Sequence, residues 1–218
     1  MIAAKRNIGA LGQEAGARAR LLCATERLLV RSGARSLSLR MIAAESGANS
    51  ALIAYYFGNI EGLLREIAHR NLDVMIAERT QLVAAAGKMK RRDAQVMQLL
   101  DAYLRPMWQA GVFSGEARAA LVIEEIQTCA GSELHAEIVA RVNDSVAEVA
   151  DPLLTHLPKL DHARLMLRLR LLCGAAMFAT GRAHMYGMFD LTERLPQGQA
   201  PEVVFDEMMR FARGAMEA

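Results

Sequence analysis

The fold of this chain is decided by residues 38–64, which read SLRMIAAESGANSALIAYYFGNIEGLL. Ser38 precedes an amphipathic helical run, and its hydroxyl oxygen can accept a hydrogen bond from the first turn as an N-cap. Gly47 tolerates a positive φ, so it can end this helix and let the chain reverse. Asn49 or Ser50 can then cap a second short helix. The pattern predicts a helix-turn-helix.

In a helix-turn-helix, the second helix enters the major groove of DNA and neighbouring groups hold phosphates. Asn49 suits adenine, whereas no arginine in this helix is available for guanine. Arg40 and the pair Tyr55 and Tyr56 are suited to phosphate contacts. The predicted DNA-binding residues are Ser38, Arg40, Asn49, Ser50, Ala51, Leu52, Tyr55, Tyr56 and Asn59.

The stretch resembles the TetR (tetracycline-repressor-like) family of transcriptional regulators. The resemblance covers residues 16–68: an amphipathic first helix from Gly16 to Arg31, the segment SLRMIAAESGA, and then YYFGNIEGLL. Two positions depart from the family pattern. The family usually has lysine where this chain has Ile60, and often has an aromatic residue where it has Ala54. Both would help to hold the DNA backbone, so we expect weaker DNA binding with the same fold.

The composition favours an all-α fold. Of the 218 residues, 53% are hydrophobic and only five are proline, and no alternating β-branched run indicates a sheet. A helix from Asn59 to about Ala86 leads out of the DNA-binding head. We expect an N-terminal helix-turn-helix domain in residues 1–70 and a C-terminal ligand-binding and dimerisation domain in residues 71–218.

Charge and cysteine content indicate a cytoplasmic protein with basic groups beside the predicted head. The net charge is only +2, but eight basic and two acidic residues precede Met41. The three cysteines are far apart, as expected for reduced thiols. The longest apolar run, from Leu171 to Ala179, is shorter than the about 20 residues that span a bilayer, so we expect no membrane partner.

The last two predicted helices carry the expected dimer interface. The first, from Asp161 to Tyr186, is apolar almost all round in its centre, which requires cover on more than one side. The resemblance implies a homodimer in which these helices form a four-helix interface. The predicted interface residues are Leu165, Leu169, Leu172, Ala176, Val204, Met208 and Phe211. Two heads about 34–36 Å apart would read two half-sites of a palindromic operator in double-stranded DNA.

The sequence offers no catalytic or metal-binding constellation. No nucleophile elbow, P-loop or dinucleotide-binding glycine motif is present. His135 stands between Glu133 and Glu137, but residues two apart on a helix point in different directions. We therefore expect no enzyme, no cofactor and no metal.

A ligand cavity is expected in the second domain, which is rich in methionine, cysteine and aromatic residues. These side chains can surround an apolar molecule with a few polar contacts, although ordinary helix packing uses the same residues. The predicted ligand-binding residues are Tyr103, Met107, Trp108, Ile123, Ile126, Gln127, Cys173, Met177 and Phe178.

These observations lead to one hypothesis and two alternatives. The hypothesis is a homodimeric, ligand-responsive transcriptional repressor that binds a pseudo-palindromic operator and is released by a small apolar effector. The first alternative is a DNA-binding activator or architectural protein without an effector. The second is a helical protein-interaction module that has lost DNA reading, as Ile60 and Ala54 would allow.

Overall fold

The structure is a computed structural model that describes residues 2–116, 118–179 and 200–217. Within these residues it consists of helices and loops without a strand, apart from one isolated bridge between Ala110 and Arg118. The all-α prediction is confirmed.

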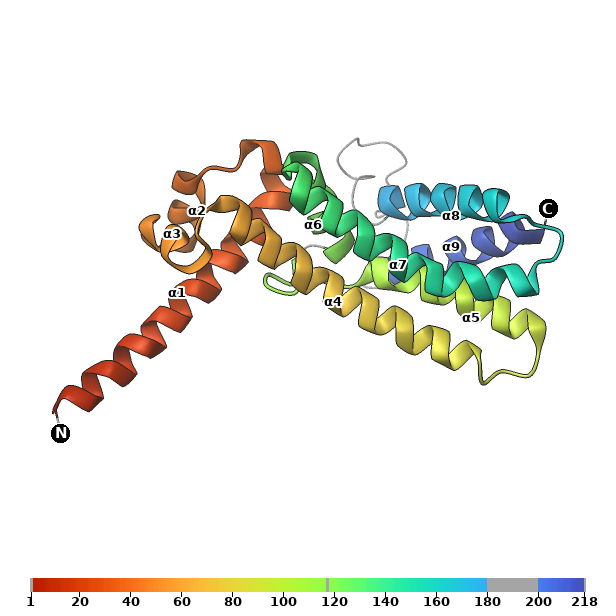
Figure 1. The fold of residues 1–218 in the computed structure, drawn as a ribbon, viewed down its shortest axis with the longest axis horizontal. Coiled ribbons are helices and arrows are strands. Elements are labelled where there is room, and N and C mark those ends of the chain that lie inside the picture. The colour runs from red at the N-terminus through yellow and green to blue at the C-terminus, as the bar shows by residue number, and fades with distance from the viewer. Residues whose placement is uncertain (1, 117, 180–199, 218) are drawn as a thin grey trace. The chain divides into compact units, whose positions relative to one another are not determined.

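Figure 1 shows the helices in chain order. Their bounds are α1 (Ile2–Ser32), η1 (Ala34–Ser36), α2 (Leu39–Ser46), α3 (Ala51–Phe57), α4 (Ile60–Ala86), α5 (Arg92–Leu104), η2 (Arg105–Trp108), α6 (Ala119–Cys129), α7 (Ser132–His156), α8 (His162–Met177) and α9 (Ala200–Glu217). The first helix begins at Ile2 rather than at Gly16. No proline interrupts residues 2–15, and their alanines favour a helix even without an amphipathic pattern.

The chain forms two compact units. Unit 1 contains Met1–Asn71 and Ala110–Ile138, and unit 2 contains Leu72–Gln109 and Val139–Ala218. Helix α6 therefore belongs to the same unit as the helix-turn-helix. The assignment of functions to either side of residue 70 stays a prediction.

In unit 1, α1 packs against α2 and α3, which lie beside it (Figure 1). Ile42 of α2 and Ile53 of α3 are fully buried against the apolar side chains of this head. The predicted caps are present as well. The Ser38 Oγ accepts the Met41 N–H at 3.3 Å, and Gly47 ends α2 with φ of 63°. The Asn59 Oδ1 accepts the Gly62 N–H at 2.8 Å at the start of α4.

Unit 2 is organised around a buried arginine. Arg79 of α4 is only 6% exposed, and its guanidinium donates to the carbonyls of Ala102 (3.2 Å) and Tyr103 (3.4 Å) in α5. It also donates to the Ser145 Oγ of α7 at 2.6 Å. Burial lowers the pKa of Arg79 and is the largest influence on it. Among the described residues no carboxylate lies within 4.0 Å of this guanidinium, so its partners are neutral groups.

Pro106 explains why α5 requires these donors. A helical Ala102 carbonyl would accept the N–H of residue 106, but proline has none. The Arg79 Nε–H supplies the missing donor. Its positive charge also lies at the C-terminal end of α5, where the helix dipole favours a cation. The Arg79 side chain thus caps the C-terminal end of α5 and connects α5 to α4 and α7.

The inner face of α8 holds four of the predicted interface residues. Leu165, Leu169, Leu172 and Ala176 are buried within the single chain, where the Tyr103 hydroxyl donates to the Leu169 carbonyl at 2.8 Å. Leu167 and Leu171 on the outer face are 57% and 65% exposed. The α8 core is apolar on both faces, so its sequence alone does not decide which face turns inward. The predicted part of this helix beyond residue 179 lies outside the described residues.

The predicted interface residues of α9 differ in how far they are buried within the chain. Met208 is buried and Val204 is half-buried, whereas Phe211 is 60% exposed. The buried aromatic residue of α9 is Phe205, whose ring meets the Trp108 ring edge-on at 5.0 Å. Tertiary contact with Trp108 therefore selects Phe205 rather than Phe211 for the core.

Candidate nucleic-acid interface

The turn before α3 presents the predicted base-reading residues. Asn49, Ser50 and Ala51 are exposed, and Leu52 is half-buried. The Asn49 Oδ1 accepts the Ala51 N–H at 2.9 Å, while the Ser50 side chain makes no capping bond. Asn49 is therefore the residue whose side chain caps α3, and the cap fixes the orientation of its amide.

The predicted phosphate-contacting residues flank these positions. Tyr55 is 72% exposed, and its ring meets the ring of half-buried Tyr56 edge-on at 4.9 Å. Ser38 and Arg40 are exposed at the first turn of α2, and Asn59 is exposed at the start of α4. Each predicted DNA-binding residue thus keeps some surface accessible, and all of them belong to the segment 38–59.

Ion pairs reduce the positive surface that the sequence indicates. Arg18 pairs with Glu66 at 2.5 Å, and Arg31 pairs with Glu45 at 2.8 Å. Arg27 lies 3.4 Å from Glu45 as well. The hydrogen bond from Arg31 is the largest influence that lowers the pKa of Glu45. These arginines hold α1 against α2 and α4, so the basic count before Met41 overstates what can face DNA.

Two exposed positions were not among the predicted DNA-binding residues. Leu39 is 47% exposed beside Arg40, and Ala54 lies on the exposed side of α3. Ala54 follows Ala51 by three residues, so the spacing that puts Ile53 inside also puts Ala54 outside. The helical spacing in the sequence therefore already indicates that Ala54 is exposed.

A buried carboxylate of α1 binds the loop at residues 113–114 and the side chain of Asn71. Glu26 of α1 is 0% exposed, and its Oε2 accepts the N–H groups of Phe113 (3.0 Å) and Ser114 (2.5 Å). Its Oε1 accepts the Asn71 Nδ2–H of α4 at 2.9 Å. The Asn71 Oδ1 in turn accepts the Val112 N–H at 3.1 Å. We call Glu26, Asn71 and residues 111–114 the Glu26 cluster.

The Glu26 cluster allows no side chain at Gly111. A Cβ at this position would lie 2.7 Å from the Glu26 Oε2. Helix α6, which follows this loop, makes a second connection to the head, because the Glu125 Oε2 accepts the Ala34 N–H at 3.1 Å. Two carboxylates therefore join residues 110–138 to α1 and the turn before α2.

The predicted ligand-binding residues are divided between the units. Ile123, Ile126 and Gln127 lie on α6 in unit 1, and the other six lie in unit 2. Tyr103 and Met107 are buried, and Phe178 is 38% exposed. Burial is the largest cause that raises the pKa of Tyr103 above its ordinary value. The effector site at these nine residues stays a prediction.

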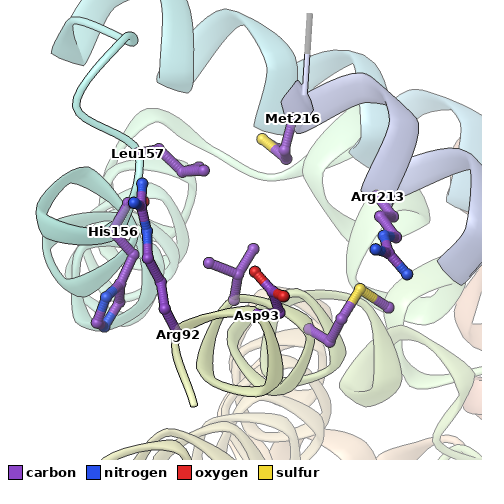
Figure 2. Close-up of a pocket in the computed structure, with 8 residues that line it drawn as sticks. Arg92, Asp93, His156, Leu157, Arg213 and Met216 are labelled. Carbon is purple, nitrogen blue, oxygen red and sulfur yellow. The ribbon is translucent and has the colours of Figure 1, made fainter.

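Figure 2 shows a pocket at the ends of α5, α7 and α9. Its volume is about 130 Å³, and its lining is Arg92, Asp93, Val96, Met97, His156, Leu157, Arg213 and Met216. The Arg92 guanidinium donates to the His156 carbonyl and so closes the end of α7. Ligand pockets commonly have about 300–1,000 Å³. This pocket is too small for a drug-sized effector, and none of the nine predicted residues lines it.

Within the described part of the chain, no three His, Cys, Asp or Glu residues gather as metal ligands do. None of the described helices is both long and apolar enough to span a bilayer.

One family model matches part of the sequence, and several solved structures share the fold. Residues 21–67 match the family model for bacterial regulatory proteins of the tetR family. The structure resembles a TetR-family transcriptional regulator from Bordetella parapertussis 12822 (TM-score 0.68, 14% identity, covering 89% of this chain and 93% of that one). It also resembles the TetR-family regulator PfmR from Thermus thermophilus (TM-score 0.62, 15% identity, coverage 91% and 98%).

A third similar structure is a putative transcriptional regulator from Saccharomonospora viridis in complex with choline (TM-score 0.57, 21% identity, coverage 92% and 95%). Identities at this level show a shared fold. No curated protein matches the sequence.

Proposed function

Because this chain belongs to the TetR family by its DNA-binding head and its fold, we propose that it is a homodimeric regulator that binds a pseudo-palindromic operator as a repressor. The observation that carries the proposal is the exposed face of α3 beside the capped start of α2, in a segment that matches the family's head. Such a protein acts on the chromosome, so we place it in the cytoplasm. We propose no catalytic activity for it.

Arg40 supplies the direct test of DNA binding. Arg40→Ala is expected to weaken operator binding about tenfold, because a hydrogen bond to a charged group contributes about 1.5 kcal/mol or more. The slope of log affinity against log salt should fall by about 1. Fluorescence anisotropy over a salt series, with random duplex as competitor, measures both quantities.

The control is Arg91→Ala, which removes an exposed arginine from the turn before α5 and should leave both quantities unchanged. If the two variants bind DNA equally well, Arg40 does not hold a phosphate. If the unaltered protein prefers no DNA sequence, the helical interaction module becomes the better proposal.

Dimerisation is proposed through the outer faces of α8 and α9. The predicted residues Leu165, Leu169, Leu172 and Ala176 are buried within the chain and offer no side-chain surface to a partner. The outer faces expose Leu167 and Leu171 on α8, Phe178 directly after α8, and Phe211 on α9. The two helices pack together in unit 2 (Figure 1). A second copy that covered these faces would remove large apolar side chains from water.

Leu171→Glu is expected to raise the dimer dissociation constant at least about tenfold, since a buried unpaired carboxylate is strongly unfavourable. Sedimentation equilibrium measures this constant directly. The matched control is Val74→Glu, which places the same charge on an exposed apolar position of α4. Equal effects of the two substitutions would place the interface elsewhere.

An effector that releases the operator is the third part of the proposal. Support comes from the shared fold with a regulator whose structure holds choline, and from the methionine and aromatic content around Met107 and Trp108. A coupling of about 1–3 kcal/mol between effector and operator would be typical. Anisotropy of the operator complex during titration with small apolar compounds and with choline tests it. If no compound changes the operator affinity, the alternative, an effector-independent DNA-binding protein, becomes the better proposal.

A further inference from the structure

The outer face of α3 is small and uncharged. Ile53 is fully buried, while Ser50, Ala51, Ala54 and Tyr55 are exposed. These exposed side chains offer two methyl groups, one hydroxyl and one phenol to base edges, and half-buried Leu52 adds a further apolar group.

The surrounding sequence contains no charge either. From Gly47 to Ile60 the chain has no Asp, Glu, Lys or Arg. Guanine is most often read by Arg or Lys, which donate to its O6 and N7 atoms in the major groove. The reading helix and its turn therefore lack the side chains that recognise guanine best.

The cap bond leaves only part of the hydrogen-bonding capacity of the Asn49 amide for base reading. One lone pair of its Oδ1 is used by the Ala51 N–H at 2.9 Å. The Nδ2 donors and the second lone pair of Oδ1 remain, which is what a bidentate contact with adenine requires. The cap holds the amide in place, so this contact costs little side-chain entropy.

The two alanines match another feature of A·T pairs. Residues three apart on a helix have Cβ atoms about 5–6 Å apart, whereas successive bases are separated by a rise of about 3.4 Å. Ala51 and Ala54 can therefore face two different bases. The 5-methyl group of thymine is the apolar feature of the major groove, and small side chains contact it directly. Because Ala51 and Ala54 are short, the backbone of α3 can approach the bases closely enough for methyl–methyl contact.

We propose that α3 reads its operator half-site through thymine methyl groups that pack against Ala51 and Ala54. This proposal rests on the proposed DNA-binding function. Asn49 reads an adenine at the start of the helix. Guanine contacts do not contribute to discrimination by α3. Ala54, which departs from the family's usual aromatic residue, is in this account a specificity-determining residue.

The test begins with a selection of the full-length protein on random-sequence duplexes. If no sequence is enriched, the proposed function itself fails. If an operator is enriched, each thymine of a half-site is replaced in turn by deoxyuridine, which removes only the 5-methyl group. Each guanine is replaced in turn by 7-deazaguanine, which removes the N7 acceptor.

Loss of the methyl group at one or two thymines should weaken binding about fourfold per position, as expected for one buried methyl group. Replacement of any guanine that faces α3 should change the affinity less than about twofold, since this helix and its turn have no Arg or Lys to donate to the guanine N7. If uridine is tolerated at every position while 7-deazaguanine weakens binding tenfold or more, the proposal is wrong and guanine is read by residues outside α3.

A protein–DNA double-mutant cycle assigns the methyl contact to its residue. In Ala54→Gly, uridine at the thymine facing residue 54 should produce no further loss, while uridine at the other sensitive thymine keeps its full effect. Circular dichroism confirms that the variant is folded, and the second thymine is the internal control for its DNA binding. Full, additive losses at both thymines would exclude a contact with Ala54.

Discussion

Replacing Arg79 by methionine is expected to lower the free energy of unfolding by about 2–4 kcal/mol. Methionine keeps an unbranched apolar stem, although a shorter one, and removes the donors to Ala102, Tyr103 and Ser145. Two buried carbonyls at the end of α5 then lose a partner, at a cost of about 1–3 kcal/mol each, and part of this is offset because no charge is buried. Urea unfolding followed by circular dichroism measures the change.

Pro106 provides a specific test of the cause. In Arg79→Met/Pro106→Ala, residue 106 regains an N–H that can bond the Ala102 carbonyl. The double variant should therefore be about 1 kcal/mol more stable than the sum of the single effects predicts. Arg164→Met, at an exposed position, should change stability by less than about 0.5 kcal/mol. Strict additivity of the two substitutions would show that Arg79 does not replace the missing proline donor.

Glu26→Gln is expected to lower the free energy of unfolding by about 2–3 kcal/mol, even though the two side chains have the same shape. All three groups around the carboxylate are donors: the N–H groups of Phe113 and Ser114, and the Asn71 amide. The glutamine Nε2 must therefore face a donor in either orientation. Asn71 cannot reverse its amide, because its Oδ1 accepts the Val112 N–H and its Nδ2 donates to the Ile67 carbonyl.

Asp at position 71 would place an acceptor opposite the glutamine Nε2, but it would also remove the Nδ2–H donor to the Ile67 carbonyl. Asn71→Asp alone places two carboxylates together and should be destabilising, but in the Glu26→Gln/Asn71→Asp double variant the glutamine Nε2 can donate to the new carboxylate. We expect the double variant to be more stable than Asn71→Asp alone, and less stable than the unaltered protein because the buried Ile67 carbonyl has lost its donor. Glu116→Gln, at a side chain that is 64% exposed, is the control. Urea unfolding of the four variants decides the matter, and a neutral Glu26→Gln would refute the donor argument.

The head could be predicted from sequence because its signals are local. Ser38, Gly47 and Asn59 act on backbone groups within three or four residues of themselves, so their type and position are sufficient. The helix-turn-helix that these signals predict is present in the structure. The end of α5 before Pro106 depends on a local signal of the same kind.

The inward and outward faces of α8 and the buried charges could not be predicted in this way. The α8 core is apolar on both faces, and only contact with α5 and α9 decides that Leu169 turns inward and Leu171 outward. Glu26 lies 88 residues from Ser114, and a buried glutamate has no distinguishing neighbour in the sequence. Eight basic residues precede Met41, but the ion pair of Arg31 with Glu45 is visible only in the fold.

The Glu26 cluster also determines how this head could be transplanted. A chimera that joins residues 1–71 to a foreign sensor domain would leave behind the amides of Phe113 and Ser114, and with them the partners of a carboxylate that is 0% exposed. It would also discard Glu125, which holds the turn before α2. The portable module is discontinuous: residues 1–71 must be carried together with 110–138, and a foreign domain must be spliced at residues 71, 110 and 138 rather than at a single joint.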